Sequence, residues 1–445
     1  MTDSRWLGSL LVVALALSAS GSAWAAGGGV LTLSRALDLG RRRAPEIHSA
    51  RAIAASEQAQ DDLARAAYYP SVTVSLTGQP QTQRLATPQV DPRNGQEFVP
   101  TIVTNSVGGG AGANAQWTLY DFGKTAGAVA NADGQLAGAD ATLHATELAI
   151  VSNVANAYLN VVYGEKLRDV AQKTVDNREE LVTIDKALIR AGLQPPVEQL
   201  RAEARAASAR SSLAAAQGAA MDARAVLSAL LQIDPASDFE VAPPRLHHPS
   251  IDVQQAMIAA QHLPSVMAAL DTVAATRGVV DSAESLYLPT VGLQLNGSYQ
   301  GVRLSTLQDW ATTGSASAML TVTETIFDPT ISPKVRAARH NMESATALAD
   351  QAKRDARQEA ARAVLGMNAA VATLEASRKA AEGAASVLTV VQARYVQGLA
   401  NPLELIDAES ADADARTQVA QSELADALAV VRLYVAIGRS IREDS

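Results

Sequence analysis

The chain has 445 residues, enough for two or three ordinary domains or for one elongated architecture. Hydrophobic residues make up 48% of it but aromatic residues only 4%. Alanine, a strong helix former, supplies much of the hydrophobic fraction that is not aromatic, and this favours close helix–helix packing over a bulky core. The net charge is −9, and no basic cluster accompanies an aromatic platform, which argues against a nucleic-acid partner. The absence of cysteine excludes disulfides, thiolate metal sites and a lipid anchor on an N-terminal cysteine.

The N-terminus has the features of a secretory signal peptide. Arg5 supplies a weak positive charge, an apolar run follows over Leu7–Ala19, and Ala23-Trp24-Ala25 forms a cleavage site of the A-x-A type. We predict that residues 1–25 are removed. A membrane anchor is the alternative, but the run is shorter than the ~20 apolar residues that a span needs. No later stretch reaches that length without charges, which predicts an exported chain without a transmembrane helix.

The first half of the mature chain predicts helices followed by a pair of strands. A helix is expected to begin near Thr32 or Ser34, the candidate N-caps, and helical sequence continues to about Ala67. Apolar and polar residues then alternate over 71–76 and again over 113–119, which predicts two strands. Residues 79–112 are rich in Pro, Gln, Thr, Asn and Gly and predict a long exposed loop between these strands.

A very long helix is predicted after the second strand. Residues 124–190 contain no proline, and as one helix they would extend for about 100 Å at 1.5 Å per residue. Two adjacent apolar seams run along this helix, so we expect it to pack against neighbours on two sides. Their members are Leu148, Val151, Ala155, Tyr158 and Val162 for one seam, and Leu143, Ile150, Val154, Ala157 and Val161 for the other. Gly192 is predicted to end the helix, and Pro196 to begin another that runs to about Gln232.

The second half of the chain repeats the plan of the first. Pro264 and Pro289 match Pro45 and Pro70 at an offset of 219 residues, whereas Asp328 matches Asp121 at 207. The difference of 12 residues places the shorter tip on the second strand pair. A second long helix is expected from about Pro333 to Gln397, and a last one from Pro402 to about Ile437. We predict repeats at 26–232 and 251–437, a connector at 233–250 and a short tail at 438–445.

The four predicted strands, each of about nine or ten residues, have the length and alternation of strands that cross a bilayer. Four strands cannot close a barrel, and an open edge in lipid leaves backbone groups unpaired. If the strands lie in a membrane, the chain must therefore oligomerise. The alternative is a soluble four-stranded sheet, which the long helices do not obviously cover.

Five segments of the chain stand out: LTLSRALDLGRRRAPEI, YYPSVTVSLTG, WTLYDFGKT, GLQPPVEQLRAEA and RYVQGLANPLELIDAES. In this order, in a duplicated chain behind a signal peptide, they resemble the TolC-type outer membrane efflux protein family. The resemblance covers about Val30 to Ile437. It implies a mainly α fold with a membrane β-barrel: a homotrimer with four strands per protomer, one shared 12-stranded β-barrel and a long α-helical barrel.

The same resemblance implies a function and partners. The protein is expected in the outer membrane, in contact with its lipid, and extending into the periplasm. It is expected to act as the passive exit duct of a tripartite efflux or type I secretion system. A periplasmic adaptor and an inner-membrane pump of the RND, ABC or MFS type would be its partners. No enzymatic activity and no cofactor or metal is expected. The histidine pair His247-His248 is interpreted as part of a solvated connector. The segment GGGAG at 108–112 precedes a strand, whereas a phosphate-binding loop precedes a helix.

The two helix–turn–helix segments carry the candidate site residues. Gly192 pairs with Gly398 and Glu198 with Glu404 at an offset of 206 residues. By resemblance, the adaptor-contacting tips are Gly192, Leu193, Gly398, Leu399 and Pro402. A plain helix C-cap with a hydrophobic contact explains the Gly-Leu pairs equally well.

By the same resemblance, four residues line or lock a periplasmic aperture: Glu198, Tyr395, Glu404 and Asp407. Glu404 and Asp407 match acidic positions that ring the aperture, although Asn401 as N-cap with Glu404 at N3 also forms a capping box. Tyr395 and Glu198 match a hydrogen-bonded pair. The family often has a basic residue two places after the second glycine, where this chain has Ala400, so we expect a lock without a charged partner there.

Two other classes of protein share some of these features. A periplasmic coiled-coil adaptor has long antiparallel helices with a tip turn, but carries one helical hairpin flanked by soluble β domains. A trimeric surface protein of the adhesin type places its membrane strands at the C-terminus. Here the strand pairs are internal and duplicated, which favours the outer membrane channel over both alternatives.

Overall fold

The computed structural model describes residues 30–86, 88–99, 101–192, 194–234, 239–304, 309–397 and 399–441. The predicted signal peptide, Leu193 and Gly398 lie outside these ranges. The chain forms two compact units: a sheet unit of Ala52–Ala141 with Met267–Gln351, and a helical unit made from the other described residues.

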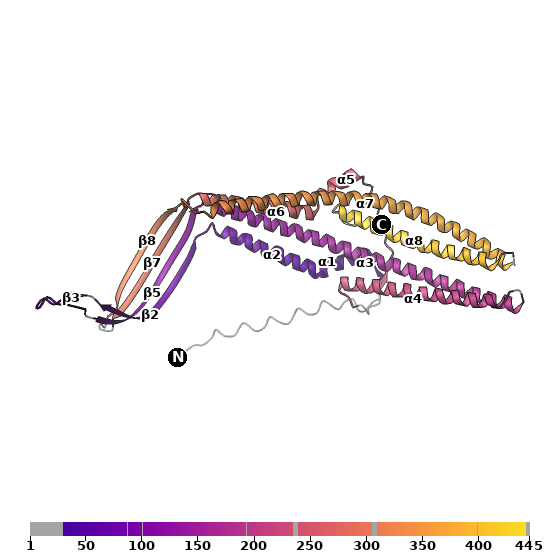
Figure 1. Ribbon diagram of the computed structural model, residues 1–445, viewed down its shortest axis with the longest axis horizontal. Coiled ribbons are helices and arrows are strands. Elements are labelled where there is room, and N and C mark those ends of the chain that lie inside the picture. Colours follow the sequence, from indigo (N-terminus) through magenta and orange to yellow (C-terminus); the bar gives the residue numbers. More distant parts are fainter. Residues whose placement is uncertain are drawn as a thin grey trace, which may run out of the picture. The chain divides into compact units, whose positions relative to one another are not determined.

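The helices and strands follow the predicted order, helix, strand pair, long helix, turn and helix, twice along the chain (Figure 1). The first series comprises β1 (Val30–Leu31), α1 (Leu33–Arg43), α2 (Pro45–Ala66), β2 (Ser71–Ala86), β3 (Gln89–Val90), β4 (Glu97–Phe98), β5 (Thr101–Tyr120), α3 (Lys124–Arg190), α4 (Val197–Leu231) and β6 (Glu240–Val241). The second comprises α5 (Val253–Ala259), η1 (Ala260–His262), α6 (Pro264–Glu284), η2 (Ser285–Tyr287), β7 (Thr290–Leu304), β8 (Ala311–Thr323), α7 (Ile331–Val396) and α8 (Pro402–Ala436).

The long helices agree with the prediction. α3 is 67 residues long and α7 is 66. Thr32 is the N-cap of α1, where its side chain accepts from the backbone N–H of Arg35. In the described part of the chain, no helix is both long enough and apolar enough to cross a membrane.

The sheet unit contains one antiparallel sheet in the order β2-β5-β7-β8. Around the first residues of β2 and β7, its register puts mostly apolar and small side chains on one face and mostly hydroxyl and amide side chains on the other. The apolar face carries Val72, Val74, Leu76, Ala113, Ala115, Trp117, Leu293, Leu295, Tyr299, Ala318, Leu320 and Val322. The polar face carries Ser71, Thr73, Ser75, Asn114, Gln116, Gln294, Asn296, Ser298, Ser315, Ser317 and Thr321.

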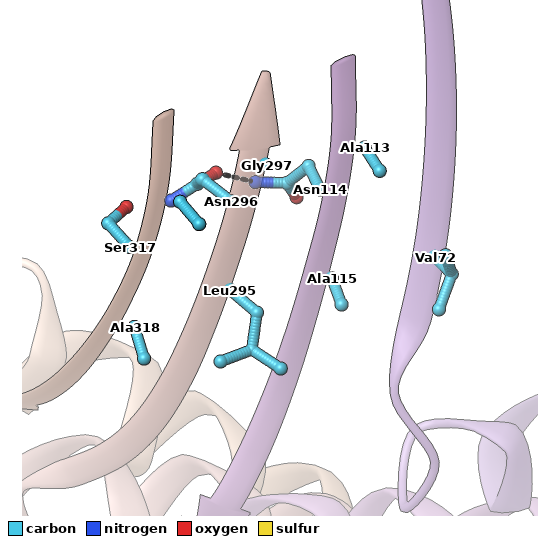
Figure 2. A pocket seen from close by; sticks show the side chains of 10 residues that line it. Val72, Ala113, Asn114, Ala115, Leu295, Asn296, Gly297, Ser317 and Ala318 are labelled. Atoms are coloured by element: carbon cyan, nitrogen blue, oxygen red, sulfur yellow. Dashed lines mark hydrogen bonds between the residues drawn. The ribbon is translucent and has the colours of Figure 1, made fainter. Parts of the chain in front are cut away.

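Polar side chains also bond to one another across the strands. Figure 2 shows the middle of the sheet, where the Asn114 amide donates to the Asn296 side chain from the neighbouring strand. Ser298 and Ser315 lie 2.8 Å apart on β7 and β8. The contact between Asn114 and Asn296 holds the two repeats together, because β5 belongs to the first half of the chain and β7 to the second.

The prediction of a long exposed loop over residues 79–112 is wrong. β2 and β5 pair continuously from Ser71↔Gln116 to Ala86↔Thr101, so most of that segment is strand. The extra residues of the first strand pair therefore lengthen its strands as well as its tip, whereas the prediction placed them all in the loop. Pro, Gln and Gly were read as loop residues, but this sheet accommodates them. Pro80 lies on β2, which is an edge strand and needs no N–H there, and the glycines of β5 avoid crowding the neighbouring backbone.

In the sheet unit, α3 and α6 approach so closely that their backbones touch. A Cβ atom on Gly134 would lie 2.5 Å from the backbone nitrogen of Ala275. A Cβ on Gly278 would lie 2.5 Å from that of Asn131, and the Asn131 side chain donates to the Ala275 carbonyl at 2.9 Å. Only glycine allows this spacing.

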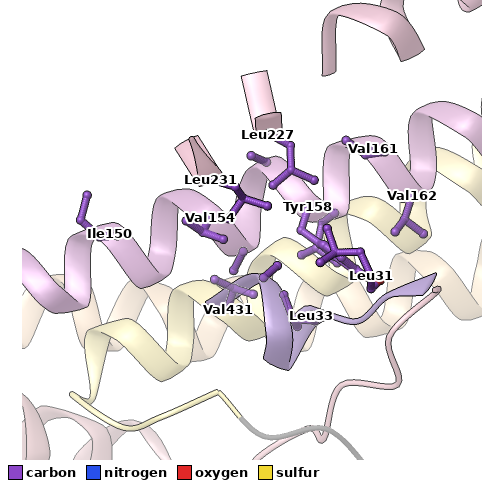
Figure 3. Packing of buried hydrophobic residues seen from close by; sticks show 14 of the residues in the cluster. Leu31, Leu33, Ile150, Val154, Tyr158, Val161, Val162, Leu227, Leu231 and Val431 are labelled. Atoms are coloured by element: carbon purple, nitrogen blue, oxygen red, sulfur yellow. The ribbon is translucent and has the colours of Figure 1, made fainter. Parts of the chain in front are cut away.

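The core of the helical unit surrounds Tyr158 of α3, with Leu227 and Leu231 of α4 and Val431 of α8 around it (Figure 3). The two predicted apolar seams of α3 both pack here: Val154, Ala155, Tyr158 and Val161 are almost completely buried. The Tyr158 hydroxyl lies 2.7 Å from the carbonyl oxygen of Leu31 and 2.6 Å from that of Ala242, and its one proton is shared between these two acceptors. It thereby ties the small parallel β1–β6 sheet to the helices.

The histidine pair of the connector is not a free loop. His248 Nε2 lies 3.0 Å from a carboxylate oxygen of Asp426, and the His247 carbonyl accepts from the Tyr434 hydroxyl at 3.2 Å. The connector is therefore held against α8 by polar contacts that the sequence did not indicate.

Candidate functional site

The first tip turn, residues 191–196, joins α3 to α4. Gly192 has a φ of +74°, the left-handed region that favours glycine, and its N–H donates to the Ile189 carbonyl at 2.9 Å. Gly192 thus ends the helix as predicted. This geometry agrees with a plain helix cap and is equally compatible with a contact surface, since Gly192, Pro195 and Pro196 are exposed.

The second tip turn, residues 397–401, joins α7 to α8. The Leu399 N–H donates back to the Arg394 carbonyl at 2.8 Å, which closes the end of α7. Asn401 is the N-cap of α8, and its side-chain oxygen accepts from the Glu404 N–H at 2.9 Å, with Pro402 at the first helical position. The predicted capping arrangement is therefore present.

Tyr395, near the end of α7, joins the two helical hairpins. Its hydroxyl donates to Asp185 of α3 at 3.0 Å and accepts from the Gln194 amide of the first tip turn at 2.9 Å. Burial is the main cause that raises the pKa of Tyr395, to about 12, so the hydroxyl keeps its proton at any physiological pH. Burial also raises the pKa of Asp185 above its usual value, although the hydrogen bond from Tyr395 opposes that shift.

The predicted pair of Tyr395 with Glu198 is not formed. Glu198 instead accepts from Arg201 at 2.8 Å, one turn along the same helix. A side chain in the first turn of α4 meets its own i+3 neighbour more readily than a residue on α7. The sequence does contain a sign of the true partner: Asp185 interrupts an apolar seam of α3 formed by Leu181, Ile184 and Leu188.

The same region contains a second polar contact between the hairpins, which the sequence reading missed. Arg178 of α3 donates to Glu409 of α8 at 2.8 Å and to Ser410 at 3.0 Å. The two charged side chains are only 11% and 5% exposed. Burial raises the pKa of Glu409 to about 7, an effect that Arg178 only partly opposes.

The acidic aperture residues face solvent in the protomer. Glu404 and Asp407 are both exposed, and the Glu404 carboxylate lies 3.9 Å from Arg394. Leu399 and Leu403 are 64% and 61% exposed, unusual values for leucines. Predicted tip residues are therefore accessible to a partner, except Leu193 and Gly398, which lie outside the described residues.

Within the described ranges, no group of three or more histidine, aspartate or glutamate side chains is placed to hold a metal ion. What the tips contain instead is a set of contacts between two helical hairpins. The hydrogen bonds of Tyr395 and the ion pair of Arg178 lie around a small apolar cluster. Besides the Tyr395 ring, its members are Leu181, Ile184, Leu188, Leu388, Val391, Ala400, Leu405 and Ala408.

A sheet with an apolar band on one face and polar side chains on the other, joined to helices of more than sixty residues, is typical of a membrane channel that extends into an aqueous space. The family profile of outer membrane efflux proteins matches residues 36–231 and 257–439. The chain belongs to the outer membrane efflux protein family.

Individual relatives support the same fold. The chain is 28% identical over 385 residues to Protein CyaE of Bordetella pertussis, covering 85% of this chain and 78% of that protein. It matches the crystal structure of VceC from Vibrio cholerae with a TM-score of 0.78 at 22% identity, over 92% of this chain and 96% of that one. It matches the open state of the Neisseria gonorrhoeae channel MtrE with a TM-score of 0.73 at 22% identity, over 92% and 89%.

The protein is therefore an outer membrane channel that serves as the exit duct of an efflux or secretion system. It lies in the outer membrane, extends into the periplasm, and is not an enzyme. The predicted family and function are confirmed, and so is the mainly helical fold with a membrane β-barrel, apart from its sharing by a trimer.

Proposed function

We propose that three copies of this chain close one 12-stranded barrel, through which cargo passes from the periplasm to the exterior. The observation that supports this most directly is the sheet itself. It has four strands, its outer strands β2 and β8 have unpaired edges in the protomer, and its apolar face suits lipid. Eight strands is about the smallest number in barrels of this kind, so closure requires other copies.

The trimer is tested by mild detergent extraction of the outer membrane followed by electrophoresis without and with boiling. We expect a species of three times the protomer mass that persists without boiling and dissociates on boiling. A protomer that stays monomeric under native conditions, or that fractionates with soluble periplasmic proteins, contradicts the proposal and favours a coiled-coil adaptor instead.

We propose further that the tip turns form the periplasmic entrance and meet an adaptor that connects the channel to an inner-membrane pump. The exposed residues of the turns support this role: Leu399 and Leu403 on the second hairpin, and Val197, the counterpart of Leu403, on the first. Exposed apolar side chains at matching positions of the two hairpins offer a repeated contact for a partner.

Glu404 and Asp407 are proposed to set the charge preference of this entrance. In a threefold assembly they place six carboxylates around one axis, and such a ring attracts cations and repels anions. We expect the double amide variant Glu404→Gln with Asp407→Asn to move the reversal potential in a salt gradient most of the way toward zero. Planar bilayer recordings measure this; an unchanged cation preference shows that the two residues only cap and solubilise the helix.

Tyr395 is proposed to hold the hairpins together in the resting channel through Asp185 and Gln194. Tyr395→Phe removes both hydrogen bonds, each contributing about 1 kcal/mol, and keeps the ring in its apolar cluster. We expect a resting conductance several-fold above that of the parent. Glu198→Gln is the matched control and is expected to leave conductance unchanged, since Glu198 accepts from Arg201 and makes no hydrogen bond to Tyr395. An unaltered conductance of Tyr395→Phe disproves the lock.

A further inference from the structure

The face of the sheet that carries the hydroxyl and amide side chains, called the polar face above, is built from uncharged residues. The register follows this face through Ser71–Gln79 on β2, Ser106–Thr118 on β5, Thr290–Val302 on β7 and Ala311–Thr323 on β8. Charged residues make up 19% of the whole chain, yet no Asp, Glu, Lys or Arg occupies the polar face within these ranges. The neutrality of this face is therefore not the result of a chain that is poor in charges.

The polar face is arranged in rows that run across the strands. Two neighbouring rows contain amides, because Gln116 is the register partner of Gln294 and Asn114 that of Asn296. The rows that follow contain hydroxyls, amides and glycines: Ser75, Gly112, Ser298 and Ser315 in one row, and Thr77, Gly110, Gln300 and Thr313 in the next. Every one of these rows is polar without carrying a net charge.

Several of these side chains bond to one another or to the strands. The side-chain oxygen of Asn296 accepts from the Asn114 amide, as Figure 2 shows, and from the Gln294 amide at 3.4 Å. The Thr321 hydroxyl donates to the Gly292 carbonyl at 3.3 Å. Amides and hydroxyls both donate and accept hydrogen bonds, so the face offers partners to water, to cations and to anions.

Charged side chains reappear where the strands end. Arg303 directly follows Val302 but pairs with Val107, so it lies on the opposite face of the sheet. Glu324 follows Thr323, the last residue of β8. The neutral stretch of the polar face therefore has the extent of the paired strands themselves.

We infer that the polar face forms a charge-neutral lumen, so that the barrel section of the duct conducts cations and anions alike. The inference deepens the proposed function and rests on it, because only a closed barrel makes this face the wall of a water-filled interior. A ring of like charges in a channel attracts ions of one sign and repels those of the other. A wall of amides and hydroxyls does neither, so the barrel accepts polar cargo of either sign. The charge preference of the duct originates outside the neutral stretch, as at the tip turns.

Reversal potentials in planar bilayers under a potassium chloride gradient test the inference with two variants at one position. Gln294→Glu and Gln294→Lys introduce opposite charges at the same place on the polar face. Because the wall carries no fixed charge there, the two changes should act with similar strength. We expect the potassium-to-chloride permeability ratio to rise several-fold with Gln294→Glu and to fall by a similar factor with Gln294→Lys.

Asn94, in the exposed turn between β3 and β4, provides the matched control. Asn94→Asp and Asn94→Lys make comparable changes of charge outside the paired strands, and we expect both to leave the permeability ratio close to that of the parent. Electrophoresis without boiling verifies that each variant assembles like the parent.

Three results overturn the inference. If neither Gln294 variant changes the permeability ratio, the polar face does not line the conducting path. If one Gln294 variant acts much more strongly than the other, fixed charges already line the barrel at that level. If the Asn94 variants shift the ratio as much as the Gln294 variants do, the effect does not depend on the polar face. A protein that forms neither oligomers nor channels contradicts the proposed function instead, so the two failures are distinguishable.

Discussion

Replacing Gly134 by alanine is expected to destabilise the sheet unit by about 1–3 kcal/mol, although alanine is the better helix former. The added Cβ would lie 2.5 Å from the Ala275 backbone nitrogen. Because the obstructing atoms are backbone and not a flexible side chain, α3 and α6 must separate to accommodate it. The separation also lengthens the hydrogen bond from Asn131 to the Ala275 carbonyl.

The same substitution at Gly383 of α7 provides a control of opposite sign. Nothing lies within 4 Å of a Cβ built there, so Gly383→Ala should stabilise its helix by up to about 1 kcal/mol. Apparent midpoints of thermal unfolding, followed by circular dichroism at one protein concentration, compare the two variants. If Gly134→Ala raises the midpoint as Gly383→Ala does, the close approach of α3 and α6 is not required for stability.

Lysine in place of Leu295 should prevent efficient assembly into the outer membrane, whereas lysine at the adjacent Gln294 should not. Leu295 lies on the apolar face of β7, between Ala115 and Ala318, near the middle of the sheet. A cation on the lipid side at that depth costs about 2–4 kcal/mol. Gln294 points to the polar face, where a charge remains hydrated.

The yield of folded protein in outer membrane fractions measures this difference. We expect Leu295→Lys to lower the yield strongly and Gln294→Lys to leave it near that of the parent. Gln294→Lys should also reduce cation conductance, because it adds positive charge to the lumen. Equal yields for the two variants contradict the assignment of the two faces to lipid and water.

The long helices and the strand alternation were predictable because they depend on local features of the sequence. Sixty-seven residues without proline, rich in helix formers, can hardly form anything but a helix, and Gly192 ends it through its own backbone freedom. The period-two pattern on either side of Val74 or Ala115 identifies a strand and its faces without any knowledge of the partner strand.

The extent of the strands was not predictable in the same way. Pro, Gln and Gly between 79 and 112 have low strand propensity, yet β2 and β5 continue through them because each pairs with a neighbour along its whole length. Strand propensity depends on cross-strand neighbours, and these were unknown from the sequence.

In the candidate site too, local contacts were predictable from the sequence and long-range contacts were not. The capping of α8 by Asn401 is a contact over three residues, and the sequence contained it. The bonds of Tyr395 to Asp185 and of Arg178 to Glu409 join residues 210 and 231 positions apart. Such pairs depend on how two hairpins are rotated against each other, which a linear pattern does not encode.

By itself, the sequence determined the class of this protein: an exported, duplicated chain of long helices and alternating strand pairs, in which the pattern of each element is local. Only the tertiary structure decided which charges are buried. Glu409 and Glu404 lie on the same helix and look alike in sequence, but α3 covers Glu409 and leaves Glu404 in solvent. That packing makes one of them half of a buried ion pair with Arg178 and the other an exposed surface charge.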